Sequence, residues 1–286
     1  MSRKAIQTGV GPTALVAIEQ HYPKSQRIIE DDLSYRVLPL GMRSFVWLVW
    51  PNWIRDWMVR ATERDAPGLW AGTMCRKRFI IERIRESLNQ IKDIVNLGSG
   101  FETGIYRFSP IPVWELDQSE NIELKRARLQ WLFGTVPASV RLISIDFDRE
   151  NVATVLTSNG YSTANPTFFV WEAVTQYLTE TGIRTIFEFL SGAERGSRLV
   201  FTYFREDFLS GRSKYGWDKR YKKYVKKDKL WLFAMDPEAW PAFLRVYGWN
   251  VLEHCGYEEL SERYVRPTGR ELASTPIERI IYAEKL

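Results

Sequence analysis

Residues 94–108, IVNLGSGFETGIYRF, decide the fold. The apolar run Ile94–Leu97 has the composition of a buried strand, and Gly98-Ser99-Gly100 follows it directly. Glycine adopts backbone conformations that other residues avoid, so this turn lets the main chain bend sharply and approach a ligand closely. Many tight turns use such a pair for structural reasons alone. The stretch therefore indicates either a cofactor loop or an ordinary strand-to-helix connection.

Short apolar runs alternate with helical segments on both sides of this stretch. The runs predicted as strands are Ile94–Leu97, Val113–Leu116, Leu142–Ile145, Phe168–Trp171, Arg198–Tyr203, Val251–Cys255 and Ile280–Ala283. The segments with helical periodicity are Ser119–Phe133, Asn151–Ser158, Thr179–Leu190 and Pro237–Val246. This alternation predicts an α/β protein with a doubly wound, mostly parallel sheet of seven strands.

Composition excludes several classes of protein. Of the 286 residues, 45% are hydrophobic and 26% are charged, which is enough to build a core and excludes global disorder. The two cysteines, Cys75 and Cys255, form no C-x-x-C pair, and the two histidines are His21 and His254. We therefore expect no disulfide scaffold, no metal site, and catalysis that runs largely without histidine.

The sequence also carries predictions about location. The first twenty residues lack the unbroken apolar core of a secretory signal. The most hydrophobic run, Phe45–Ile54, is interrupted by Pro51 and is shorter than the roughly 20 residues that span a bilayer. We expect a cytoplasmic protein with no membrane partner.

Two regions do not fit the sheet. Residues 1–90 are predicted to form an N-terminal helical cap, in which Trp47, Trp50, Trp53 and Trp57 recur at three- and four-residue spacing. That spacing favours a packed helical face, with a ligand-binding wall as the alternative. Residues 91–286 then form the sheet domain.

The second region is an insertion at residues 206–235, predicted to be a substrate lid. Its segment Gly211–Phe233 carries nine Lys or Arg residues against two Asp, a local charge of +7 where the whole chain has +5. Basic and aromatic side chains near a cavity mouth would attract and orient an anionic substrate. The alternatives are a solvated surface helix and a nucleic-acid surface, and the modest charge of the whole chain argues against nucleic acid.

The second and third strands add a nucleoside signal. Asp117 ends the second strand 19 residues after Gly98, the distance at which an acidic residue binds a ribose hydroxyl in doubly wound folds. Asp146 and Phe147 end the third strand and suit an adenine, although Asp146 also suits a helix cap. A dinucleotide site needs a third glycine, whereas here Glu102 would repel a pyrophosphate. S-adenosyl-L-methionine, with an ammonium and a sulfonium, is the favoured cofactor.

At this point the motifs resemble a known family. NLGSGFETGIYRF is similar to the LGAGLDTRAYRL signature of the leucine carboxyl methyltransferase family, class I S-adenosylmethionine-dependent enzymes that include bacterial O-methyltransferases of secondary metabolism. Arg76–Phe79, VWELDQ at 113–118 and FVWEAVTQYLTE at 169–180 follow in the family's order. Glu102 and Gly104 depart from the usual Asp and Arg, and Ile81-Glu82 stand where relatives often have two acidic residues.

The resemblance implies a Rossmann-like fold and a set of contacts. Arg76 or Arg78 would bind the methionyl carboxylate, and Glu172 would lie near the ammonium group. The cofactor residues it implies are Arg76, Arg78, Gly98, Gly100, Asp117, Asp146, Phe147 and Glu172. The residues expected at a small-molecule substrate are Tyr177, Tyr215, Trp217, Tyr221, Lys222 and Tyr224.

Methyl transfer needs alignment more than acid–base chemistry. A carboxylate is already ionised at neutral pH, whereas a phenol normally needs a base. The scarcity of histidine therefore favours O-methylation of a carboxylic acid, and no general base is assigned. Methylation of a phenol or enol in polyketide-type metabolism and a non-catalytic cofactor-binding scaffold are the alternatives. The sequence leaves the acceptor and the oligomeric state open.

Overall fold

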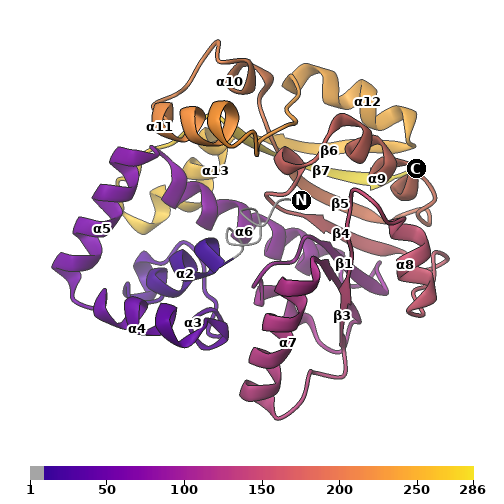
Figure 1. The fold of residues 1–286 in the computed structure, drawn as a ribbon, viewed down its shortest axis with the longest axis horizontal. Helices are drawn as coiled ribbons and strands as arrows, with labels where there is room; N and C mark the ends of the chain where they lie inside the picture. Colours follow the sequence, from indigo (N-terminus) through magenta and orange to yellow (C-terminus); the bar gives the residue numbers. More distant parts are fainter. Residues whose placement is uncertain (1–9) are drawn as a thin grey trace.

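The computed structural model describes residues 10–286, so the first nine residues of the predicted cap lie outside the described residues. The centre of the molecule is a seven-stranded sheet in the order β3-β2-β1-β4-β5-β7-β6 (Figure 1). Its strands are β1 (Asp93–Leu97), β2 (Val113–Asp117), β3 (Val140–Ser144), β4 (Thr167–Trp171), β5 (Arg198–Phe204), β6 (Trp249–Cys255) and β7 (Glu278–Lys285). The predicted fold class and strands are confirmed.

Strands β1 to β5 are parallel to one another, and β7 lies antiparallel between β5 and β6. Every residue of β1, β2 and β4 is buried, whereas the edge strands β3 and β6 include exposed positions. Central strands of a doubly covered sheet face apolar layers on both sides, which is why their sequences are continuous apolar runs rather than alternating ones.

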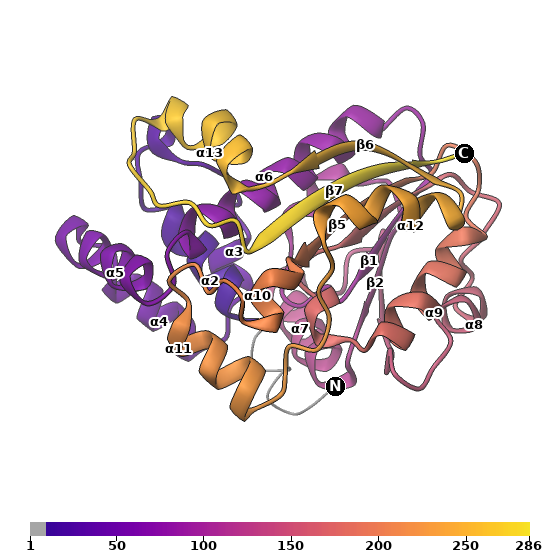
Figure 2. The same cartoon turned by 90° about the horizontal axis from the view of Figure 1, so that it is seen from above.

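Helices cover both faces of the sheet, as Figure 2 shows from above. Phe168 of β4 packs on the face covered by α6 (Leu69–Ser87) and α13 (Tyr257–Tyr264), with Phe79 and Leu260 in the same cluster. The next residue, Phe169, packs on the opposite face. That face is covered by α8 (Val152–Ser158), α9 (Glu180–Ser191) and α12 (Trp240–Val246). Helix α7 (Ser119–Phe133) covers the end of the sheet at β3.

The N-terminal region forms helices α2 (Val10–Glu19), α3 (Ser34–Val37), α4 (Leu40–Leu48) and α5 (Asn52–Asp65) before α6. Helix α2 packs through Val16 and Ile18 into the cluster that α6 shares with the sheet. The packed tryptophan face expected on α4 and α5 is wrong, because the four indoles at positions 47, 50, 53 and 57 are exposed. Helix α4 buries Val46 and α5 buries Val59 instead.

The segment between β5 and α12 builds a small core of its own. It contains α10 (Glu206–Ser210), the short turn α11 (Asp218–Arg220) and a π-helix, Tyr221–Lys227. Trp217 and Trp231 pack there against Phe204 and Phe208. The Trp217 indole donates a hydrogen bond to the Pro67 carbonyl at 2.9 Å, which ties the segment to the N-terminal helices.

Candidate active site

A cavity of about 510 Å³ opens at the carboxyl ends of β1, β2 and β4. Most of its lining comes from the turns after these strands, α2, α6 and the segment after β5. In open α/β sheets, ligands bind at this edge, where the strand order reverses on the two sides of β1. The cavity therefore lies where the topology predicts a ligand.

The glycine turn after β1 forms the floor of this cavity. Gly98 and Gly100 have φ angles of +76° and +47°, a region that residues with a Cβ rarely adopt. A Cβ on Gly98 would also collide with the side chain of Val174. The hydroxyl of Ser99, between them, is buried and has no hydrogen-bond partner within the described protein. This turn thus keeps a donor free beside the cavity.

Asp117 holds the turn from the neighbouring strand. One carboxylate oxygen accepts from the Gly100 amide at 2.6 Å, and the other accepts from the Gln118 amide at 2.7 Å and the Asn121 side chain at 2.8 Å. A carboxylate offers about four lone-pair directions, so one remains for a ligand hydroxyl. Asp117 therefore shapes the turn and also lines the cavity.

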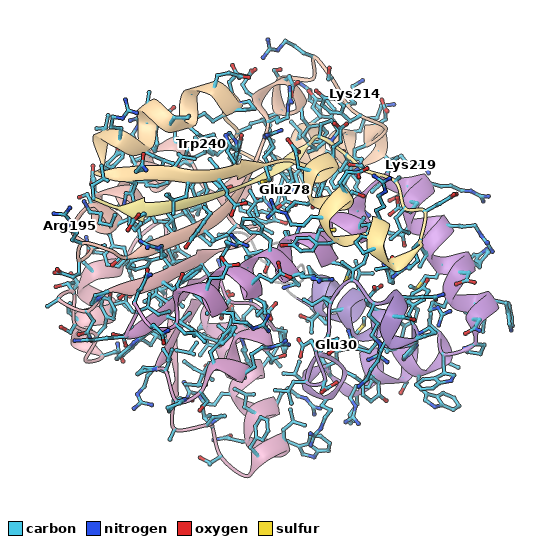
Figure 3. The ribbon with its side chains drawn as sticks, turned by 180° about the vertical axis from the view of Figure 1, so that it is seen from behind. Glu30, Arg195, Lys214, Lys219, Trp240 and Glu278 are labelled. Atoms are coloured by element: carbon cyan, nitrogen blue, oxygen red, sulfur yellow. The ribbon has the colours of Figure 1, made fainter. Side chains whose placement is uncertain are left out.

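A buried cluster of five charges lies beside the glycine turn. Arg76 pairs through Nε with Glu172 at 2.7 Å and through Nη1 with Glu278 at 2.7 Å. Lys77 pairs with Glu172 at 3.0 Å and also contacts Glu102. All five side chains line the cavity, and Glu278 lies at the centre of the molecule in Figure 3.

The cluster keeps its charges because its members are paired. Burial alone would raise the pKa of Glu102, but the Lys77 ammonium and the Gly104 amide outweigh burial and lower it to about 2. Burial would lower the pKa of Lys77, but Glu102 and Glu172 raise it above its ordinary value. Three carboxylates with two cations leave this end of the cavity negative. A site of this charge suits an ammonium or sulfonium group and disfavours a pyrophosphate.

Aromatic residues form the other end of the cavity. Tyr177, Phe204, Trp217, Tyr224 and Trp231 line it there. Three buried polar atoms at this end lack a partner within the described protein: Arg220 Nε, Trp231 Nε1 and Gln176 Oε1. Buried polar groups in folded proteins are nearly always paired, so these atoms mark where a polar ligand group would lie.

Most of the residues predicted at the cofactor line this cavity. They are Arg76, Gly98, Gly100, Asp117, Phe147 and Glu172. Arg78 does not, because it lies on another side of α6, where it pairs with Glu82 at 3.0 Å and stacks on Tyr264. Asp146 is also outside the cavity, where its side chain accepts from the Asp148 amide at 3.1 Å. The capping alternative for Asp146 is wrong as well, because the N-cap of α8 is Asn151, whose side chain accepts from the Thr154 amide.

The predicted substrate residues divide in a similar way. Tyr177, Trp217 and Tyr224 line the cavity. Tyr215 instead hydrogen-bonds Asp207 at 2.5 Å, and Tyr221 packs in the small core against Phe208. Lys222 lies exposed on the outer side of the π-helix, and Arg220, two residues earlier, is the cation of this segment that reaches the cavity.

Sequence reasoning missed several lining residues. Lys77 belongs to the Arg76–Phe79 motif, and Glu102 is one of the departures from the family signature. The sequence therefore contained a signal for this pair of residues. Gln176 belongs to the quoted stretch at 169–180, and Trp231 lies in the predicted lid segment Gly211–Phe233, where it was expected in an aromatic wall. Glu278 had no such signal in the sequence, because it begins a strand 202 residues after its partner Arg76.

Two absences hold for residues 10–286. No cluster of His, Cys, Asp and Glu with the geometry of a metal site occurs among them. No helix in this part of the chain is long and apolar enough to cross a membrane.

Comparison with known proteins agrees with the fold and the site. The profile of the leucine carboxyl methyltransferase family matches residues 9–191, so the chain belongs to this family. A candidate S-adenosyl-L-methionine-dependent methyltransferase of Mycolicibacterium smegmatis is 27% identical over 197 residues, covering 65% of this chain and 64% of the relative. A similarly described protein of Mycobacterium avium is 26% identical over 199 residues, covering 65% and 61%. The chain thus matches less than two thirds of the length of these relatives.

Solved structures show the same fold at low sequence identity. A DUF574-family protein from Streptomyces avermitilis has a TM-score of 0.57 and 12% identity, with 88% of this chain and 97% of that chain covered. A candidate methyltransferase from Thermobifida fusca has a TM-score of 0.54 and 13% identity, with 81% and 88% covered. The predicted family resemblance is confirmed, and the relatives are named for the cofactor that the sequence predicted.

Proposed function

We propose that the protein transfers a methyl group from S-adenosyl-L-methionine to an oxygen of a small carboxylic acid. The observation that carries the acceptor class is the aromatic end of the cavity, where Arg220 Nε and Trp231 Nε1 are buried donors without acceptors. An anionic group offers the acceptor that such donors lack. Arginine suits a carboxylate because its charge is permanent and its donors are fixed in one plane.

The cofactor fits the opposite end. Asp117 is the acceptor for a ribose hydroxyl, and Phe147 supplies an aromatic face for adenine. Arg76 is the candidate for the methionyl carboxylate, and Glu172 with Glu102 offers negative charge to the ammonium group. S-adenosylmethionine supplies an electrophilic methyl group, and the protein's residues only hold and align the two reactants.

No proton needs to leave a carboxylate acceptor, which agrees with the groups that the cavity offers. His21 and His254 do not line it. The Lys77 ammonium and the Gly104 amide hold the pKa of Glu102 well below its ordinary value, so this carboxylate is a weak base, and Glu172 is engaged by Arg76 and Lys77. Alignment of reactants can supply effective molarities of about 10⁵ M or more.

The experiment uses methyl-labelled S-adenosylmethionine with a panel of carboxylic acids and phenols, and product mass spectrometry as the readout. We expect label in a base-labile ester. A base-stable ether would instead support the phenol or enol alternative, for which the tyrosines and tryptophans of the cavity are suitable walls. Cofactor binding without turnover on any acceptor would support the scaffold alternative.

A variant pair tests the role of Arg220. Arg220→Gln should raise KM for a carboxylate acceptor by about tenfold or more, because a charged hydrogen bond is lost. Arg220 also pairs with Asp65 at 3.2 Å, so Asp65→Asn is the matched control that breaks this ion pair and keeps the guanidinium. Equal KM effects in both variants would assign Arg220 to holding the segment in place rather than to the acceptor.

A further inference from the structure

Helices α4 and α5 and the turn between them present a set of large apolar side chains that are mostly exposed in the described protein. Trp47, Trp50, Trp53 and Trp57 are between 62% and 74% exposed. Leu40, Phe45 and Leu48 are also exposed on these helices. We call these seven residues the tryptophan face. Soluble proteins rarely expose a contiguous apolar area of this kind unless it binds something.

The tryptophan face lies on the outside of the molecule. Helix α5 is at the periphery in both Figure 1 and Figure 2, away from the sheet. Trp53, Trp57, Arg60 and Arg64 follow one another at helical spacing, and all four are exposed. The other side of α5 buries Val59 and contributes Thr62 to the cavity. The exposed side of α5 can therefore contact a second molecule or a surface without disturbing the core.

The charges along this exposed side are all positive. Arg60 and Arg64 have no ion-pair partner among residues 10–286, whereas the acids of α5 are engaged elsewhere. Asp56 pairs with Arg55, and Asp65 pairs with Arg220. The acid between them, Glu63, accepts from two backbone amides at the start of α6. An occupant of this surface must supply the negative charge.

We propose that the tryptophan face binds the surface of an anionic lipid bilayer. Indole rings favour the bilayer interface because they pair an apolar body with one polar N–H, and leucine and phenylalanine side chains can enter the acyl boundary. Arg60 and Arg64 then meet the negative headgroups. This is peripheral binding, and it revises the expectation from the sequence that a membrane plays no part.

A second copy of the chain fits the surface less well. A symmetric dimer brings the same patch from both copies together, so it would bury the unpaired Arg60 and Arg64 of both copies in one interface. The face offers no free carboxylate to separate them. Like charges across an interface are unfavourable, whereas an anionic bilayer neutralises them.

Vesicle flotation tests the proposal with the whole chain and with neither cofactor nor acceptor present. The probes are vesicles of phosphatidylcholine alone and of phosphatidylcholine mixed with phosphatidylglycerol. We expect strong binding to the mixed vesicles, weak binding to the neutral ones, and loss of binding as salt rises. Arg60→Glu with Arg64→Glu should weaken binding at least about tenfold, and Trp53→Ser with Trp57→Ser should have a comparable effect.

Two controls match these variants in chemistry and differ in place. Arg195→Glu reverses an exposed charge at the opposite edge of the molecule from Lys219, as Figure 3 shows. Val246→Ser removes an exposed apolar residue of α12. Both should bind vesicles like the unmodified protein. All four variants should unfold cooperatively and bind S-adenosylmethionine equally.

The possible results distinguish bilayer binding from the alternatives. Absence of binding to either vesicle would overturn the proposal, and so would binding that the Arg195 control weakens as much as the α5 variants do. A dimer in light scattering that the tryptophan variant dissociates, without vesicle binding, would assign the face to a second copy. Because no methyl transfer is measured, failure here leaves the proposed acceptor untouched.

Discussion

Asp117 performs two tasks with one carboxylate. It fixes the Gly100 amide and Asn121 while it lines the cavity, so its removal takes away a ligand acceptor and loosens the turn. Asp117→Ala should therefore weaken binding of S-adenosylmethionine by roughly 2–3 kcal/mol. Isothermal titration measures this directly. Unchanged affinity in a folded variant would show that the nucleoside binds elsewhere.

Asp31 is a second carboxylate whose environment makes a prediction. Burial and, to a lesser extent, the Glu102 carboxylate raise its pKa to about 6, although the Leu33 amide, Arg107 and Lys77 oppose the change. The folded state therefore binds a proton that the unfolded state releases at its ordinary pKa of 3.8. Stability from this group is complete at acid pH and is lost as pH rises through about 4 to 6.

The substitution Asp31→Asn should reveal how much stability the protein loses when the Asp31 carboxylate ionises. Asparagine keeps the shape and still accepts from the Leu33 amide, but it cannot ionise. At neutral pH the variant should be more stable than the unmodified protein by about 1–3 kcal/mol, and the difference should vanish near pH 4. Urea unfolding at several pH values measures the difference. A variant that is equally destabilised at every pH would show that hydrogen bonding, not ionisation, governs this position.

At the scale of elements, the turn after β1 is the most sensitive connection. Gly100→Val should abolish cofactor binding while unfolding remains cooperative, because the turn needs a positive φ beside the cavity. Gly134→Val is the matched control, since Gly134 also has a positive φ, of +76°, and ends α7 with nothing near its missing side chain. The control should lose some stability and keep its affinity. Retained binding in Gly100→Val would make the turn a plain connection.

The elements differ in how well sequence could predict them. Phe168 and Phe169 lie on opposite faces of the sheet, and both are buried, so the run around them reads as a strand without ambiguity. The tryptophans of α4 and α5 have equally clear helical spacing. Periodicity shows which residues share a side of a helix, but the partner that covers this side is a property of the whole fold. Here the indoles face outward.

The residues of the candidate site also differ in how well the sequence could predict them. Gly98, Asp117 and Glu172 follow parallel strands, which all end at one edge, so the sequence was enough to expect them together. Glu278 begins a strand that runs the other way, and no local pattern connects it to Arg76. Residues such as Arg220 depend on how a long segment folds back over the cavity, which has no short sequence signature.

For the whole molecule, Cys75 can report global unfolding. Cys75 is buried, and burial with the nearby Glu19 carboxylate raises its pKa to about 12, so its thiolate is scarce in the folded state. Iodoacetamide should modify Cys75 only through unfolding. S-adenosylmethionine at about 100 times its dissociation constant should then slow the reaction roughly 100-fold. Mass spectrometry of the Cys75 peptide gives the rate, and a rate that ignores the ligand would indicate local opening of α6.

The position of β7 within the sheet sets an order of assembly. Strand β6 leaves the ribosome before β7, yet among residues 10–286 its only neighbour in the sheet is β7, so its backbone stays unpaired until the later strand arrives. Strand β5 waits with an open edge as well. Arg76 gains its ion-pair partner Glu278 only when β7 enters the sheet. A nascent chain therefore has the glycine turn long before it has a complete binding cavity. During synthesis, this exposed edge is the place where a chaperone would be needed most.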